Sequence, residues 1–189
     1  MAATLIIVIH QIIFQGMFVA RNVTLRRRLG APIRGKNREA TRSIVFFAAF
    51  ILSALALSLF EAPVGRVAWL GEATAVTLTL ILLAANLLVS AASLLHLGSS
   101  WRVGVVAEQE TALVDDGIYR FSRNPYFLSY LLLFAAYTVL LQNVILLLLA
   151  LVGFGLIHAM VLREEQHLLA QHGEVYRRYQ RKVARYFLV

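Results

Sequence analysis

Cysteine is absent from this 189-residue chain, which excludes disulfide bonds, thiolate metal sites and cysteine nucleophiles. Acidic residues are also few, because 10 Asp and Glu stand against 18 Lys and Arg and leave a net charge of +8. Charged residues make up only 15% of the chain, whereas 60% of the residues are apolar. Such a composition is typical of an integral membrane protein. Proline is scarce, and its three positions all lie in or beside expected loops: Pro32, Pro63 and Pro125.

The apolar residues form five long runs: 4–20, 43–60, 73–97, 126–141 and 144–162. A helix needs about 20 residues to cross about 30 Å of hydrocarbon. We therefore expect an all-α membrane protein with five transmembrane helices, of which the fourth is short and is either tilted or only partly lipid-facing. Gln142 and Asn143 separate the last two runs and predict a tight helical hairpin. No Lys or Arg precedes the first run, so it should be a retained span and not a secretory signal.

The basic residues predict how the chain crosses the membrane. Residues 21–42 contain eight Lys and Arg against one acid, so the positive-inside rule places this loop in the cytoplasm. The loop 61–72 carries a single basic residue, Arg66, and is predicted to be external. The N-terminus is then outside, and the loop 98–125 and the C-terminal tail are cytoplasmic. The net charge is thus interpreted as a signal of topology and of contact with anionic lipids, and not of nucleic-acid binding.

The loop between the third and fourth runs is long, and it contains Trp101 and a turn at 115–117. Loops of this length in a compact membrane protein are usually functional or disordered, and its apolar residues argue against disorder. The C-terminal tail predicts an amphipathic helix with arginines between its apolar positions. These positions have near-helical spacing: Leu168, Leu169, Tyr176, Tyr179, Val183 and Tyr186.

Several titratable residues cluster where the last apolar run ends. Glu164 and Glu165 follow it directly, and a carboxylate within hydrocarbon costs roughly 2 to 3 kcal/mol unless it has partners. They either mark the entry of the helix into water, with Arg163 as a neighbour, or belong to a site. His158 lies close to them in sequence and is a candidate for a substrate-side role or for packing.

Other polar residues lie within the predicted spans. Gln11, Gln15 and Asn86 are interpreted as hydrogen-bonding groups between helices, which is the usual role of such residues in a bundle. His96, near the end of the third run, is interpreted as a packing residue. No group of histidines and carboxylates has the spacing of metal ligands, so no metal is expected.

An ordered set of short motifs in the second half of the chain carries a resemblance. Gly117 and Tyr119 precede Arg123-Asn124-Pro125-Tyr126; after a hairpin come Glu164-Glu165 and Leu168, and then Gly173-Glu174, Tyr176 and Tyr179. In this order and spacing, residues 94–187 resemble the isoprenylcysteine carboxyl methyltransferase family, which belongs to a wider group with the phospholipid methyltransferases. The resemblance implies one membrane domain, 1–189, in which 1–93 supply the first spans and 94–189 a methyltransferase-like region.

The resemblance also implies S-adenosylmethionine as the cofactor, bound from the cytosol, and a lipid-like or prenylated methyl acceptor in the membrane. The implied cofactor-binding residues are Thr111, Ala112, Leu113, Val114, Tyr119, Asn124, Pro125, Tyr126, Phe127 and Glu164, with Gln109 as a possible addition. A carboxylate acceptor needs no general base, whereas an amine must lose a proton, for which His158 or Glu165 could serve. No nucleic acid and no metal are among the expected partners.

The chain departs from the family at two positions. Asn124 stands where the family usually has histidine, and Met160 stands where it tends to have an arginine suited to a substrate carboxylate. Arg163 could replace that arginine only from a different helix face. Three alternatives therefore stay open beside carboxyl methylation: methylation of a phospholipid or amine, an NADPH-dependent sterol-type reductase, and a non-catalytic membrane scaffold.

Overall fold

The chain folds into a bundle of long helices. The computed structural model describes residues 1–30, 38–61, 63–101 and 112–186. Within these residues the only β-pairing is one isolated bridge between Arg66 and Asn143. The α-helices are α1 (Ala2–Leu29), α2 (Arg38–Leu59), α3 (Glu72–Leu97), α4 (Pro125–Leu141), α5 (Val144–His172) and α6 (Glu174–Lys182), and the 3-10 turns are η1 (Gly98–Ser100) and η2 (Gly117–Arg120).

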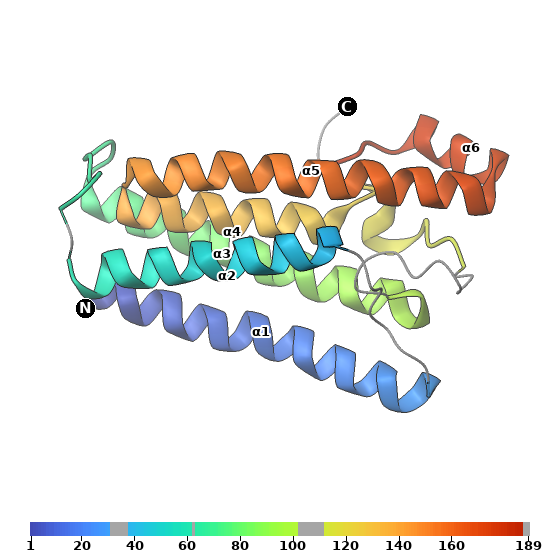
Figure 1. Cartoon of the computed structure of the whole chain (residues 1–189), viewed down its shortest axis with the longest axis horizontal. Coiled ribbons are helices and arrows are strands. Elements are labelled where there is room, and N and C mark those ends of the chain that lie inside the picture. Colours follow the sequence, from blue (N-terminus) through green and yellow to red (C-terminus); the bar gives the residue numbers. More distant parts are fainter. Residues whose placement is uncertain (31–37, 62, 102–111, 187–189) are drawn as a thin grey trace.

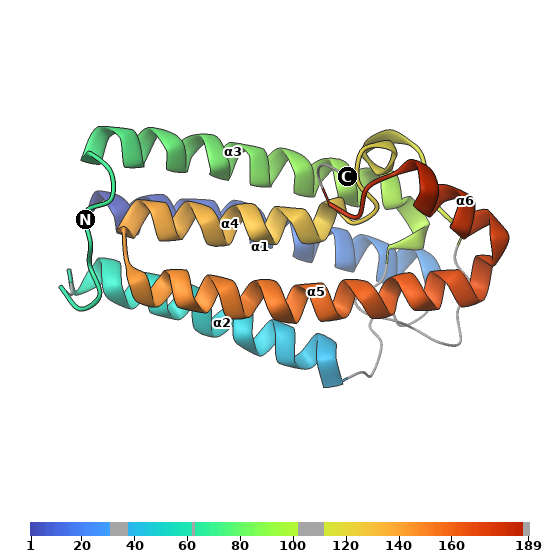
Figure 2. The same cartoon turned by 90° about the horizontal axis from the view of Figure 1, so that it is seen from above.

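Five of the helices, α1 to α5, run along one common axis (Figures 1 and 2). Residue 1 and the connections α2–α3 and α4–α5 lie at one end of the bundle. The other end, which we call the basic end, comprises residues 21–30, 98–101, 112–124 and 163–186. It holds the last turn of α1 with its three arginines, the two 3-10 turns and α6. The connections that carry the motifs therefore meet at one end of the molecule.

Four helical segments are long and apolar enough to cross a membrane: Ala2–Leu29, Thr41–Leu59, Glu72–Ser100 and Val144–His172. The protein is therefore an all-α membrane protein in the part of the chain that the structure describes. The fifth apolar helix, α4, has 17 residues, or about 26 Å, which is less than a bilayer core. It contacts α1, α2, α3 and α5, and Leu133, Ala136 and Tyr137 are fully buried. Its interior position agrees with the expectation that α4 is short and faces lipid only in part.

The hairpin between α4 and α5 has the predicted two-residue connection. Gln142 adopts a left-handed conformation (φ 44°), which ends α4. Asn143 caps α5, because its side-chain oxygen accepts hydrogen bonds from the backbone nitrogens of Ile145 and Leu146 at 2.9 and 3.4 Å. Two polar residues thus both stop one helix and start the next.

Two helices extend further than their apolar runs. α1 continues through Arg26 to Leu29 and ends at Gly30, whose left-handed φ of 60° only glycine adopts without strain. α5 continues from Leu162 to His172 and ends at Gly173. Arginine, glutamate and leucine are good helix formers, so a helix does not stop merely because it becomes polar. The tail is consequently not one helix: α6 is separate and ends at Lys182.

Candidate functional site

A cavity of about 720 Å³ opens among α1, α2, α4, α5 and the segments beside η1 and η2. Most of its polar lining lies at the basic end, where Asn124, Tyr119 and Glu164 meet, and two glutamines of α1 add polar groups further in. Its inner half is aromatic and aliphatic, with Phe47 and Phe134 among the lining residues. A volume in the range of about 300 to 1,000 Å³ suits an organic ligand. The cavity therefore joins a polar compartment to an apolar one that reaches between the spans.

Local sequence explains how Asn124 reaches this place. Pro125 is the first residue of α4, a position that tolerates proline because its missing N–H would have no helical partner. The residue before a proline avoids the helical region, and Asn124 accordingly has φ −133° and ψ 51°. The Asn124 side chain does not cap α4; its Nδ2 instead donates to Glu165 Oε1 at 3.0 Å. The motif thus begins a helix and also reaches across to α5.

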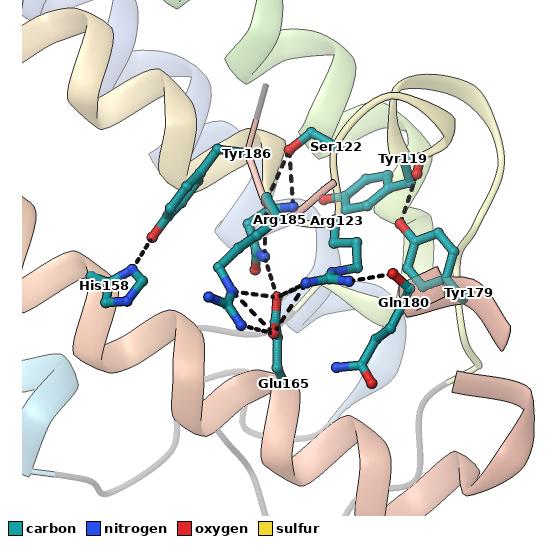
Figure 3. A network of polar contacts seen from close by, with 10 residues as sticks. Tyr119, Ser122, Arg123, His158, Glu165, Tyr179, Gln180, Arg185 and Tyr186 are labelled. Atoms are coloured by element: carbon teal, nitrogen blue, oxygen red, sulfur yellow. Dashed lines mark hydrogen bonds and ion pairs between the residues drawn. The ribbon is translucent and has the colours of Figure 1, made fainter. Parts of the chain in front are cut away.

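Glu165 lies at the centre of a buried ion-pair network (Figure 3). Arg123 Nε donates to its Oε1 at 3.2 Å, and Arg185 Nη2 donates to its Oε2 at 3.0 Å. Glu165 is 4% exposed and Arg123 10%, so both charges depend on this pairing. The hydrogen bond to Glu165 also raises the pKa of the Arg185 guanidinium, which stays charged. The network ties the start of α4, the C-terminal part of α5 and the C-terminal segment together.

The C-terminal segment completes the network through its backbone. Arg123 Nη1 donates to the carbonyl of Gln180 at 2.8 Å, and the Arg123 backbone nitrogen donates to the carbonyl of Ala184 at 2.9 Å. The carbonyl of Arg185 accepts from Ser122 Oγ at 3.3 Å. The residues after α6 therefore run alongside residues 122–124 and hold them in place.

Glu164 has a different position from its neighbour. Successive residues of an α-helix are rotated by about 100°, so Glu164 points into the cavity while Glu165 points toward α4 and the tail. Met160 and His167 are on the same helix face as Glu164, at spacings of four and three residues, and also line the cavity. Ser43 of α2 donates a hydrogen bond to the Met160 sulfur at 2.7 Å.

Tyr119 and Tyr179 form one wall of the polar compartment. The Tyr179 hydroxyl donates to the Tyr119 carbonyl at 2.7 Å (Figure 3). Burial raises the pKa of both phenols, so both rings stay neutral. Gly117 makes the approach of this turn to α3 possible: its φ is 54°, and a Cβ there would lie 1.9 Å from Cδ2 of His96. The His96 side chain, which is exposed, thus lies directly against this turn.

The structure brings most of the predicted cofactor-binding residues to the cavity. The lining includes Ala112, Leu113, Val114, Tyr119, Asn124, Tyr126, Phe127 and Glu164. Pro125 is buried at the start of α4 and does not contribute to the lining. Thr111 and Gln109 lie outside the described residues. The segment 112–115 forms no helix, so its backbone amides are not committed to helical hydrogen bonds.

The predicted catalytic residues lie elsewhere. The Glu165 carboxylate accepts hydrogen bonds from Arg123, Asn124 and Arg185. His158 Nδ1 is hydrogen-bonded to the Tyr186 hydroxyl at 3.1 Å (Figure 3). Arg163 is exposed on α5. None of the three is among the described residues that line the cavity.

Sequence reasoning missed several residues of the site. His167 was detectable as the residue three positions after Glu164 on one helix face. Trp101 lines the cavity and is held by Asn22, whose Oδ1 accepts from Trp101 Nε1 at 2.8 Å. The pairing of Arg185 with Glu165 joins residues from separate segments and had no local signal.

The model of the phospholipid methyltransferase family matches residues 74–175, more than half of the chain. The chain belongs to the phospholipid methyltransferase family. Membership implies a membrane methyltransferase that acts on lipid-like substrates, and methyltransferases of this family typically use S-adenosylmethionine. A comparison with curated proteins finds no match. The matched range contains Arg123, Asn124 and both glutamates, but it ends before Tyr176.

Proposed function

We propose that this member of the phospholipid methyltransferase family transfers a methyl group from S-adenosylmethionine to the head of a lipid-like acceptor, by carboxyl methylation of the isoprenylcysteine type. The observation that carries the proposal is the cavity, in which Glu164, Tyr119 and the segment 112–114 meet at the basic end and continue into an apolar inner half. One compartment suits a charged cofactor and the other a hydrocarbon tail.

The polar compartment fits S-adenosylmethionine group by group. The Glu164 carboxylate is available on the cavity wall to pair with the ammonium. Backbone amides of Leu113 and Val114 can bind polar edges of the ligand, and Tyr126 supplies an aromatic surface for packing. When bound, S-adenosylmethionine supplies an activated methyl group for a single displacement. The chain's own contribution is then to orient the partners and to exclude water.

The acceptor would occupy the inner half with its reactive head at the polar compartment. A carboxylate head requires no proton removal, and among the described lining residues His167 can donate a hydrogen bond to it. Glu165, His158 and Arg163, which the sequence proposed as catalytic, are then best assigned to positioning or to the surface. We further propose that the basic end is cytoplasmic and that the acceptor enters sideways from the membrane, near α4 and α5.

The hydrogen bonds that Arg123 already makes count against the alternative of an NADPH-dependent reductase. An NADPH enzyme needs a cation for the 2′-phosphate, but the Arg123 guanidinium already binds Glu165 and the carbonyl of Gln180. Arg120, three residues earlier, is exposed and is not among the described lining residues. The geometry therefore favours the methyltransferase.

The deciding experiment is equilibrium binding of S-adenosylmethionine to the protein in lipid nanodiscs, with NADPH as competitor. We expect saturable binding that NADPH does not displace and that Glu164→Gln weakens. Glu72→Gln is the matched control, because Glu72 is an exposed residue in the first turn of α3, at the opposite end of the bundle. Absence of binding, or displacement by NADPH, would overturn the proposal.

The type of methylation is tested on the product. Membrane lipids and prenylated cysteine derivatives are incubated with the protein and S-adenosylmethionine that carries a labelled methyl group. A carboxyl methyl ester releases labelled methanol in alkali, whereas an N-methyl group is retained. Alkali-stable label would assign the enzyme to amine methylation.

A further inference from the structure

Two glutamines of α1 line the inner half of the cavity, where its other walls are apolar. Gln11 and Gln15 are one helical turn apart, and both contribute to the lining. Their depth along the bundle can be read from Phe14, which lies between them in the sequence. The ring centroids of Phe14 and Tyr130 are 5.6 Å apart. Tyr130 is one turn, or about 5.4 Å, further along α4 than Tyr126. An amide at this depth lies beyond the polar compartment, among hydrocarbon.

The other polar groups at this level form a chain of hydrogen bonds whose direction can be derived. Asn86 Nδ2 donates to the carbonyl of Ser129 at 2.6 Å, so Asn86 Oδ1 is an acceptor. It lies 2.9 Å from His10 Nε2, which must therefore carry the proton. His10 Nδ1 is then an acceptor for the Tyr137 hydroxyl at 2.8 Å, a shorter contact than the 3.4 Å to the carbonyl of Ile7.

The same direction continues to the cavity wall. Gln11 Nε2 donates to the Tyr137 oxygen at 3.0 Å, and Gln11 Oε1 accepts from Gln15 Nε2 at 3.3 Å. Every link from Gln15 to Ser129 thus points the same way. This series of hydrogen bonds ends beside the cavity at Gln15 Oε1, to which none of the described residues donates a hydrogen bond. A carbonyl oxygen in an apolar compartment costs free energy unless a donor reaches it.

We propose that Gln15 is a specificity-determining residue that accepts a hydrogen bond from a hydroxyl group on the ligand in the inner half of the cavity. The inference rests on the proposed function, since it assigns to the lipid-like acceptor a hydroxyl in the part that lies beyond the methyl-accepting head. His10, Tyr137 and Asn86 are positioning residues in this scheme, because they fix the orientation of Gln11 and thereby of Gln15. A purely hydrocarbon chain would leave the Gln15 carbonyl without a partner.

The test compares farnesol with farnesyl methyl ether, which keeps the oxygen but cannot donate a hydrogen bond. Binding to nanodisc-embedded protein is followed by Trp101 fluorescence, because Trp101 lines the cavity. The background carries Trp69→Phe, which removes the other tryptophan, in the α2–α3 connection away from the cavity. We expect farnesol to bind about fivefold more tightly than the ether, as one hydrogen bond predicts.

Two variants complete the test. Gln15→Met keeps the length of the side chain and should abolish the preference for farnesol, whereas Gln166→Met, at an exposed position of α5, should retain it. Equal affinities for the two probes in the unchanged cavity, or a preference that persists in Gln15→Met, would overturn the inference. The first comparison needs no variant at Gln15 and so does not depend on its folding. Because the assay contains no S-adenosylmethionine, selective farnesol binding by a protein that fails to bind S-adenosylmethionine would overturn the proposed function alone.

Discussion

Replacing Glu165 with alanine should destabilise the basic end more than any loss of a surface charge. The substitution would leave Arg123, which is 10% exposed, without its carboxylate partner. Removing one partner of a buried ion pair costs about 3 to 5 kcal/mol, and the lower figure applies here because Arg123 keeps its bond to the carbonyl of Gln180. For a chain of this size, about 3 kcal/mol corresponds to a fall in melting temperature of roughly 6 to 12 °C.

The same network predicts a smaller effect for Arg185→Ala. Arg185 is 36% exposed, and Glu165 would keep its bonds to Arg123 and Asn124. We expect a loss of about 1 kcal/mol, or roughly 2 to 4 °C. Glu174→Ala is the control, because the pair between Glu174 and Arg181 is exposed on α6, and its melting temperature should equal that of the unchanged protein.

The assay is thermal unfolding in one detergent, followed by tryptophan fluorescence, with the double variant Glu165→Ala/Arg123→Ala included. The double variant removes both charges, so its loss should be smaller than the sum of the two single losses. A melting temperature of Glu165→Ala within about 2 °C of the unchanged protein, or additive losses in the double variant, would refute the role of this ion pair.

Three further predictions concern the cavity and its walls. Gly117→Ala should lower the melting temperature, because it adds left-handed strain of about 1 to 3 kcal/mol and a Cβ that overlaps His96, and His96→Ala should restore part of the loss in a thermal unfolding assay. Gly153→Ala places a methyl group 2.5 Å from a ring atom of the inner half, so we expect methyl transfer to the acceptor to fall while the dissociation constant of S-adenosylmethionine stays unchanged. Met160→Arg combined with Asn124→His should raise the rate of carboxyl methylation in the labelled-methanol assay, and an unchanged or lower rate would count against a carboxylate acceptor.

Most of the fold could be predicted from the sequence because hydrocarbon imposes strong rules. Apolar runs indicated the helices, and Gln142-Asn143 indicated the hairpin, since two polar residues between apolar runs leave little room for another connection. The ends of α1 and α5 were less predictable. Polarity marks where a helix can meet water, but Gly30 and Gly173 mark where the helix stops.

The candidate site was predictable only where its residues are local in sequence. Tyr119, Asn124 and Glu164 belong to compact motifs, and all three line the cavity. The partners of Glu165 were not predictable in the same way, because Arg123 and Arg185 come from segments that meet only after the bundle has formed. Gln15 was expected to join helices, but within the described residues its side chain donates a hydrogen bond to Gln11 of the same helix. Tertiary contacts, which a sequence pattern does not encode, decide these roles.

The two adjacent glutamates show why such roles have to be separated by structure. Two neighbouring carboxylates repel each other, but Glu165 is surrounded by Arg123 and Arg185, whose two positive charges exceed its single negative charge. Glu164, one position earlier on α5, instead lines the cavity and presents its carboxyl group there. It follows that substitutions at the two positions should affect different measurements: Glu164→Gln should weaken ligand binding with little change in melting temperature, and Glu165→Ala should lower the melting temperature first. If both variants lost stability equally, Glu164 would have to be a structural residue as well, and the cavity would lose the anionic group that makes it suitable for a cationic ligand.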